Sequence, residues 1–190
     1  MNIAIIVGSV RTGRKTPLAA NYLRQELLKN DKITAITYLD IAEYNFPVMQ
    51  ERNAYLKVKP EGMEEFSQKL EAADGIVVIS PEYNGSIPGA LKNTLDYFYP
   101  ELSKKVIGLL TVSAGNLGGI NVHHDLQKWV LHMRAYAIPM KYVLTQIHQA
   151  FDETGIPTDE HFIKSTSLFI NELTWLTEAI SNQKKQIINC

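Results

Sequence analysis

The chain has 190 residues, of which 45% are hydrophobic and 21% are charged, and its net charge is −1. These are the proportions of a soluble globular protein, and the length suits one domain, so we expect residues 1–190 to form a single domain. The near-neutral charge gives no reason to expect nucleic acid as a partner.

No stretch approaches the roughly 20 apolar residues that cross a bilayer. The N-terminus lacks the basic stretch and the cleavage site of a signal peptide. The only cysteine is Cys190, which leaves no disulfide framework and no cysteine metal cluster within one chain. We therefore expect a cytoplasmic protein that does not associate with a membrane.

Strand-like and helix-like segments alternate along the chain. The strand-like segments are short, apolar and rich in β-branched residues, whereas the helix-like segments repeat apolar residues every three or four positions. We predict strands at Ile3–Val7, Ile33–Leu39, Ile76–Ile79, Val106–Val112 and Pro139–Ile147. We predict helices over residues 16–30, 61–73, 88–98, 119–135 and 159–185.

This alternation of strands and helices predicts a parallel sheet that helices cover on both faces. We expect an α/β fold of three layers, doubly wound, with the strand order 2-1-3-4-5. In that order the ligand crevice lies at the carboxyl ends of the first and third strands. A long irregular segment from Asp40 to Pro60 breaks the alternation and is a candidate lid or interface.

The loop after the first strand, residues 8–17, has the composition of a phosphate site. Ser9 and Thr16 offer hydroxyl groups, and Arg11, with Arg14 or Lys15, offers positive charge. The helix that follows directs unpaired N–H groups and a partial positive charge at the loop. An exposed turn with incidental basic residues is the alternative interpretation of this loop alone.

Two better-known phosphate motifs do not match this loop. A nucleoside-triphosphate loop needs a lysine directly after its second glycine, but Arg14 separates Gly13 from Lys15, so the register is off by one. The dinucleotide motif G-x-G-x-x-G is absent, because only Gly8 and Gly13 are present.

The loop after the third strand, Pro81-Glu82-Tyr83-Asn84-Gly85, can hold a flat ring. Its main-chain groups and the Asn84 amide can hydrogen-bond the polar edge of a ring while Tyr83 packs near the plane. Gly85 lets the main chain approach closely. The alternatives are that Tyr83 is a core aromatic residue and that Asn84-Gly85 is an ordinary turn.

The fourth strand is followed by a third loop of small residues, Ser113-Ala114-Gly115 with Gly118-Gly119. It can border the same crevice and hydrogen-bond the pyrimidine edge of the ring through its main chain. A flexible turn is the alternative interpretation.

With these three loops the chain resembles the NAD(P)H-dependent FMN reductase family of flavodoxin-like proteins, which includes quinone, azo-dye and chromate reductases. The matching parts are Gly8-Ser9-Val10-Arg11, the block from Ser80 to Asn93, and the third loop. These motifs span most of the domain, and the C-terminal third carries none.

The resemblance implies FMN as cofactor, NADPH or NADH as electron donor, and flavins, quinones or similar small molecules as acceptors. It implies a homodimer or homotetramer in which a neighbouring subunit helps to roof the flavin. The residues that it assigns to FMN are Ser9, Arg11 and Thr16 at the phosphate, with Arg14 and Lys15 as further candidates, Pro81, Glu82, Tyr83 and Asn84 at the ring and ribityl chain, and Ser113 and Gly115 nearby.

The sequence offers no convincing acid–base or nucleophilic pair, so we expect no catalytic side chain and assign the chemistry to N5 of the flavin. Adjacent helical residues point about 100° apart, so His123 and His124 are poorly placed to share an ion, and we expect no metal. His132, His148 and His161 are interpreted as surface or interface residues. A flavin-binding electron carrier and a nucleotide-processing enzyme without flavin remain as other classes.

Overall fold

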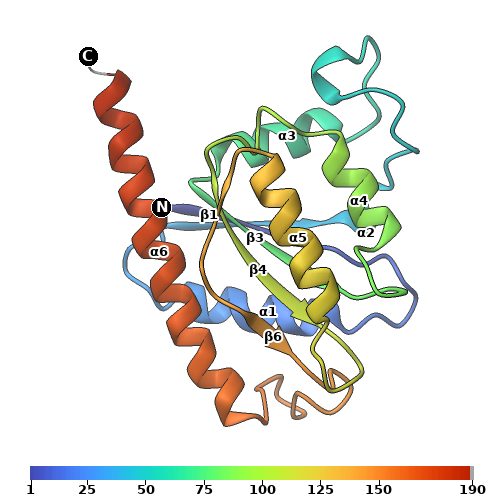
Figure 1. Ribbon diagram of the computed structural model, residues 1–190, viewed down its shortest axis with the longest axis vertical. Helices are drawn as coiled ribbons and strands as arrows, with labels where there is room; N and C mark the ends of the chain where they lie inside the picture. Colours follow the sequence, from blue (N-terminus) through green and yellow to red (C-terminus); the bar gives the residue numbers. More distant parts are fainter. Residues whose placement is uncertain (189–190) are drawn as a thin grey trace.

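The computed structural model describes the backbone of residues 1–188 and the side chains as far as residue 184. In that part of the chain, helices cover both faces of one sheet (Figure 1), and none of them is long and apolar enough to cross a bilayer. The strands are β1 (Asn2–Val7), β2 (Ala35–Asp40), β3 (Gly75–Pro81), β4 (Val106–Val112), β5 (Tyr136–Ala137) and β6 (Tyr142–Leu144). The helices are α1 (Thr16–Leu27), α2 (Ile41–Tyr44), the 3-10 helix η1 (Asn53–Tyr55), α3 (Met63–Ala72), α4 (Gly89–Asp96), α5 (Ile120–His132) and α6 (Glu160–Ile188).

The strands lie in the order β2-β1-β3-β4, and both β5 and β6 pair with β4 at the far edge. Each of these strand pairs is parallel. The expected order 2-1-3-4-5 and the doubly wound, flavodoxin-like α/β fold are therefore confirmed. Because β1 and β3 are neighbours, the loops that follow them leave the same edge of the sheet side by side.

Two apolar clusters fill the space on the two faces of the sheet. Successive strand residues point to opposite faces, so Ile3 and Ile5 join one cluster while Ala4 and Ile6 join the other. Helices α1 and α6 cover the first face, and α3, α4 and α5 cover the second. Strands β3 and β4 are buried along their whole length, which explains their largely apolar sequences.

The prediction of one strand over Pro139–Ile147 is wrong. The edge consists of two short pieces, β5 and β6, and the four residues 138–141 between them lie opposite only Gly108 and Leu109 of β4. Pro139 lies in this insertion, where its nitrogen has no hydrogen to donate to a neighbouring strand. The pairing with β4 therefore ends after β5 and resumes at β6.

The irregular segment over residues 40–60 is anchored on the second face of the sheet, which α3, α4 and α5 cover. Phe46 packs against three aromatic rings of the core there, with ring centroids 5.6 to 6.2 Å apart. The Asn93 side chain on α4 accepts a hydrogen bond from the Met49 N–H at 2.8 Å and donates one to the Pro47 carbonyl oxygen at 2.8 Å. The path of the segment thus follows α4.

Replacing Asn93 with Ala removes the side chain that holds this main chain, so we expect the free energy of unfolding to fall by about 1–3 kcal/mol. Lys92→Ala is the matched control on the same helix, because its half-exposed ion pair with Asp96 is worth at most about 1 kcal/mol. Urea unfolding of both variants measures the difference. An N93A protein as stable as the parent would contradict the anchoring role.

Candidate functional site

Loops that follow β1, β3, β4 and β6 meet at the carboxyl edge of the sheet and enclose a cavity of about 230 Å³. A second hollow of about 410 Å³ adjoins it and is lined by Asn84 together with residues of the first. The sequence-predicted residues that line the first cavity are Arg11, Arg14, Thr16, Pro81, Glu82, Tyr83 and Ser113.

The remaining predicted residues take different places around the cavity. Ser9 is buried, and its hydroxyl shares a hydrogen bond of 2.8 Å with the Tyr83 hydroxyl, which joins the first loop to the second. Lys15, Gly85 and Gly115 are exposed and lie outside the lining of both hollows. The structure therefore brings most of the predicted set together and separates Lys15 from it.

The loop after β1 runs into the N-terminus of α1, which is open to an anion. The N-cap residue, Lys15, makes no side-chain hydrogen bond to the first turn. Pro17 has no N–H and the Leu18 N–H donates to the Lys15 carbonyl oxygen at 3.0 Å, so the Thr16 N–H and the positive end of the helix dipole are what the first turn offers to an anion. Gly13 has a φ of 71°, and no atom lies within 4 Å of the position a Cβ would take. A ligand can therefore approach the main chain closely there.

Arg14 is held within the protein instead of being offered to a ligand. Its guanidinium donates to both oxygens of the Asp40 carboxylate, at 2.5 and 2.7 Å, and to the Ser9 carbonyl oxygen at 2.6 Å. The hydrogen bond to Asp40 raises the pKa of Arg14 above its usual value, against the opposing effect of burial. Arg14 ties the loop to the end of β2, whereas Arg11 forms no ion pair within the described residues.

The loop after β3 is a tight two-residue turn. Tyr83 and Ser86 exchange two main-chain hydrogen bonds of 3.1 Å, and Asn84 and Gly85 have φ values of 52° and 78°. Left-handed residues at both central positions define a type I′ turn, which asparagine and glycine favour. The turn interpretation of Asn84-Gly85 is confirmed, while Tyr83 is half-buried at the cavity and is not a core residue.

Glu82 binds the start of α5. Its carboxylate accepts hydrogen bonds from the Asn121 and Val122 main-chain N–H groups at 3.0 and 3.3 Å and from the Asn121 side chain at 3.1 Å. Carboxylates are favoured at helix N-termini, where N–H groups lack partners. The Glu82 side chain is thereby occupied, and its main chain is what remains for a ligand.

The structure adds residues after β6 that the sequence did not place at the site. The Ser113 N–H donates to the Leu144 carbonyl oxygen at 3.0 Å, and the Ile147 N–H donates to the Ser113 carbonyl oxygen at 2.9 Å. These bonds set Ile147 and His148 beside the third loop, where both line the cavity. His148 is exposed, as expected for a surface residue. Its position just after the last strand is the signal in the sequence from which its place at this edge could have been predicted.

The other histidines do not form a site with a metal. In the described residues no three His, Cys, Asp or Glu side chains are arranged to hold an ion. His123 is buried, and this burial lowers the pKa of its imidazole, so the neutral ring is favoured.

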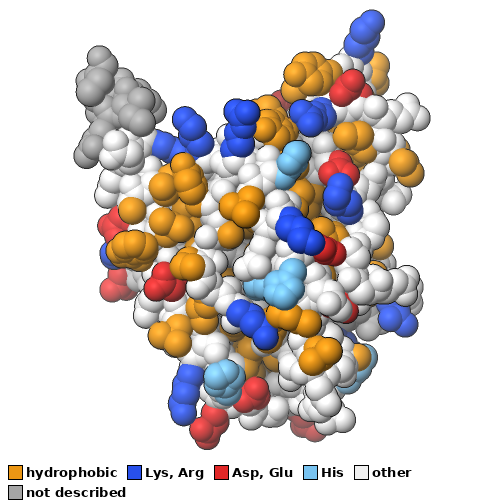
Figure 2. All heavy atoms as spheres, in the orientation of Figure 1, with side chains coloured by type: hydrophobic (Ala, Val, Ile, Leu, Met, Phe, Trp, Pro, Cys, Tyr) orange, Lys and Arg blue, Asp and Glu red, His pale blue; other side chains and the backbone are white. Residues whose placement is uncertain are grey.

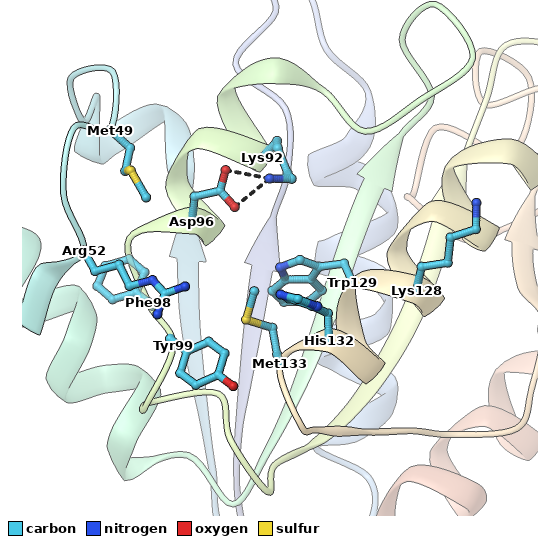
Figure 3. A pocket seen from close by; sticks show the side chains of 10 residues that line it. All are labelled: Met49, Arg52, Lys92, Asp96, Phe98, Tyr99, Lys128, Trp129, His132 and Met133. Carbon is cyan, nitrogen blue, oxygen red and sulfur yellow. Dashed lines mark hydrogen bonds and ion pairs between the residues drawn. The ribbon is translucent and has the colours of Figure 1, made fainter.

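A separate groove of about 430 Å³ lies between the segment at Met49 and Arg52, the end of α4, and α5 (Figure 3). Arg52 lies over the Tyr99 ring, 4.9 Å from its centroid, on one side of the groove. Trp129 and His132 of α5 face it from the other side. None of the loops at the carboxyl edge contributes to this groove, so it is not part of the candidate site.

The chain matches the family model described as NADPH-dependent FMN reductase over residues 1–149, which include every loop of the candidate site. The chain belongs to the NADPH-dependent FMN reductase family. The resemblance inferred from the three loops is therefore confirmed, as are FMN as the cofactor and NAD(P)H dependence.

The relatives of this chain match most of its length. It is 31% identical over 156 residues to an NADPH azoreductase of Bacillus sp. (strain OY1-2), covering 82% of this chain and 83% of the relative. It is 29% identical over 140 residues to a quinone reductase of Escherichia coli (strain K12), covering 71% and 72%. The solved flavoenzyme FerB, an NAD(P)H:(acceptor) oxidoreductase from Paracoccus denitrificans, shares the fold, with a TM-score of 0.76, 24% identity and coverage of 94% and 97%.

The side chains and main chain of the candidate site fit FMN. The uncapped start of α1 and the unpaired Arg11 suit a phosphate, and the open space at Gly13 allows close approach. Tyr83, the type I′ turn and the loop at Ser113 lie on the side away from β2, where an aromatic face and main-chain groups suit a ring.

We expect Arg11→Gln to raise the dissociation constant for FMN roughly 10- to 100-fold, because a charge-assisted hydrogen bond to phosphate is lost. Lys15→Gln is the matched control, since it removes the same charge four residues away but outside the cavity. Quenching of FMN fluorescence measures both affinities. Equal weakening by the two variants would point to a general charge effect and contradict a specific role for Arg11.

Proposed function

We propose that the protein transfers electrons from NADPH or NADH, through bound FMN, to small acceptors such as flavins, quinones or azo compounds. Family membership supports NAD(P)H:FMN oxidoreductase activity, and the relatives named azoreductase and quinone reductase suggest the acceptor classes. The observation that carries the proposal is that the start of α1 and the loop after β3 line one cavity, and that the hydrogen bond between Ser9 and Tyr83 joins the loops after β1 and β3. We place this activity in the cytoplasm, where reduced nicotinamides are supplied.

In this proposal the residues bind and orient the cofactor. Ser9, Arg11 and Thr16 hold the phosphate, and Arg14 fixes the loop that carries them. The main chain of Pro81–Gly85, the Tyr83 ring and the loop at Ser113–Gly115 hold the ribityl chain and the ring. FMN itself supplies the transfer of hydride and electrons at N5, and no protein side chain is needed as general acid or base for the first half-reaction.

The purified protein is expected to be yellow or to become yellow with added FMN, and NADPH or NADH is expected to bleach the flavin absorption under anaerobic conditions. Adding a quinone should then restore the colour. An electron carrier without nicotinamide turnover would bind FMN and stay oxidised with NAD(P)H alone. A protein that takes up no FMN would overturn the proposal, and so would an FMN complex that neither nicotinamide reduces.

We further propose that the protein is a homodimer or homotetramer that associates through the outer face of α5. Leu131 is 69% exposed there, and Lys128 and His132 beside it line the groove of Figure 3. Lysine, histidine and apolar side chains are interspersed over this face in Figure 2. Association of two copies about a two-fold axis would bury the same face on both.

Leu131→Asp is expected to shift the protein toward the monomer of 21.4 kDa, because a charge would be buried in the interface. Light scattering coupled to size-exclusion chromatography gives the mass. Leu168→Asp on α6 is the matched control, since Leu168 is 59% exposed and lies on another helix. If L131D keeps the mass of the parent, α5 is not the interface.

A further inference from the structure

His148 is the one basic side chain that lines the cavity from outside the first loop. It follows Ile147, which is 93% buried (7% exposed) in the first apolar cluster. The Ile147 N–H bonds to the Ser113 carbonyl oxygen at 2.9 Å, and the Gln149 N–H closes a turn on the Gln146 carbonyl oxygen at 2.8 Å. The imidazole is therefore carried by a fixed turn and not by a loose loop.

The place of His148 in the sheet sets it apart from the phosphate loop. The phosphate loop follows β1, whereas His148 follows β6, and β3 and β4 lie between them. Neighbouring strands are about 4.8 Å apart, so the two loops leave the sheet about 14 Å from each other. The main-chain hydrogen bond between Ile147 and Ser113 sets His148 beside the third loop, which the proposed function assigns to the ring and not to the phosphate.

The other ionisable groups that share the cavity are either bound within the protein or lie on the phosphate loop, which leaves His148 as the basic side chain beside the third loop. Arg14 is bound to Asp40, and the Glu82 carboxylate is bound to the start of α5. Arg11 lies on the phosphate loop, and Tyr83 shares its hydroxyl with Ser9. No other charged side chain of the described residues lines this cavity.

We propose that His148 contacts the pyrimidine edge of the bound flavin ring and that its imidazolium form stabilises the negative charge that the ring gains on reduction. This inference rests on the proposed function. Transfer of a hydride adds two electrons and one proton to the ring, so one negative charge has to be accommodated. The imidazolium supplies the opposite charge without giving up a proton. The stabilisation requires the imidazolium form, so it decreases as pH rises and the imidazole ring loses its proton.

The test compares the midpoint potential of the FMN complex of the parent with that of His148→Gln, by titration against a redox dye from pH 5.5 to 8.5. At pH 5.5 we expect reduced FMN to be bound about tenfold less well, relative to oxidised FMN, in H148Q, which lowers the potential by about 30 mV for a two-electron couple. This difference should shrink toward pH 8.5. Gln149→Ala, the exposed neighbour outside the cavity, is the control and should match the parent.

The affinity for oxidised FMN separates this role from phosphate binding, and it should change less than threefold in H148Q. A large loss of that affinity, or a potential equal to that of the parent at every pH, would overturn the role proposed for His148 while leaving the proposed function intact. His148→Asn, measured in parallel, guards against a folding defect of one variant. If the parent itself takes up no FMN, the proposed function fails and this inference fails with it.

Discussion

The close approach of β1, β3 and α4 at Gly8 is the constraint on which the site depends. The Gly8 N–H donates to the Ile79 carbonyl oxygen at 2.8 Å. A Cβ on this residue would lie 2.9 Å from that oxygen and 2.6 Å from the Leu91 side chain. Only a residue without a side chain lets the first loop leave the sheet in direct contact with β3. The distance between the phosphate loop and the ring loop follows from this contact.

Polar side chains then fix the loops to one another and to the helices. Arg14 binds Asp40 at the end of β2, Ser9 binds Tyr83, and Glu82 binds the start of α5. The Arg14 guanidinium and the Glu82 carboxylate are satisfied within the protein, so they hold the loops around the crevice in a defined arrangement. A preorganised site of this kind suits an enzyme whose cofactor carries the reactive atoms.

The parts of the molecule that could be predicted are those that local pattern determines. Buried parallel strands have largely apolar sequences, and loops rich in glycine and hydroxyl residues follow three of them, so the sequence predicted the sheet order and most of the residues that line the candidate cavity. The roles of Arg14 and Glu82 could not be predicted, because their partners, Asp40 and Asn121, are 26 and 39 residues away in the chain. The break at Pro139 was missed because the residues after it predicted one strand from Pro139 to Ile147, and the two residues of β5 before it were not predicted as a strand.

That break has a consequence for the behaviour of the protein at high concentration. The open edge of a sheet can pair with a strand from another molecule, and long flat edges promote aggregation. Here the edge beyond β4 is divided into pieces of two and three residues, with the exposed Pro139 and Lys141 between them. An incoming strand would find neither a continuous row of donors and acceptors nor an uncharged surface. The same irregularity that interrupts the ladder thus makes this edge of the sheet a poor template for an added strand.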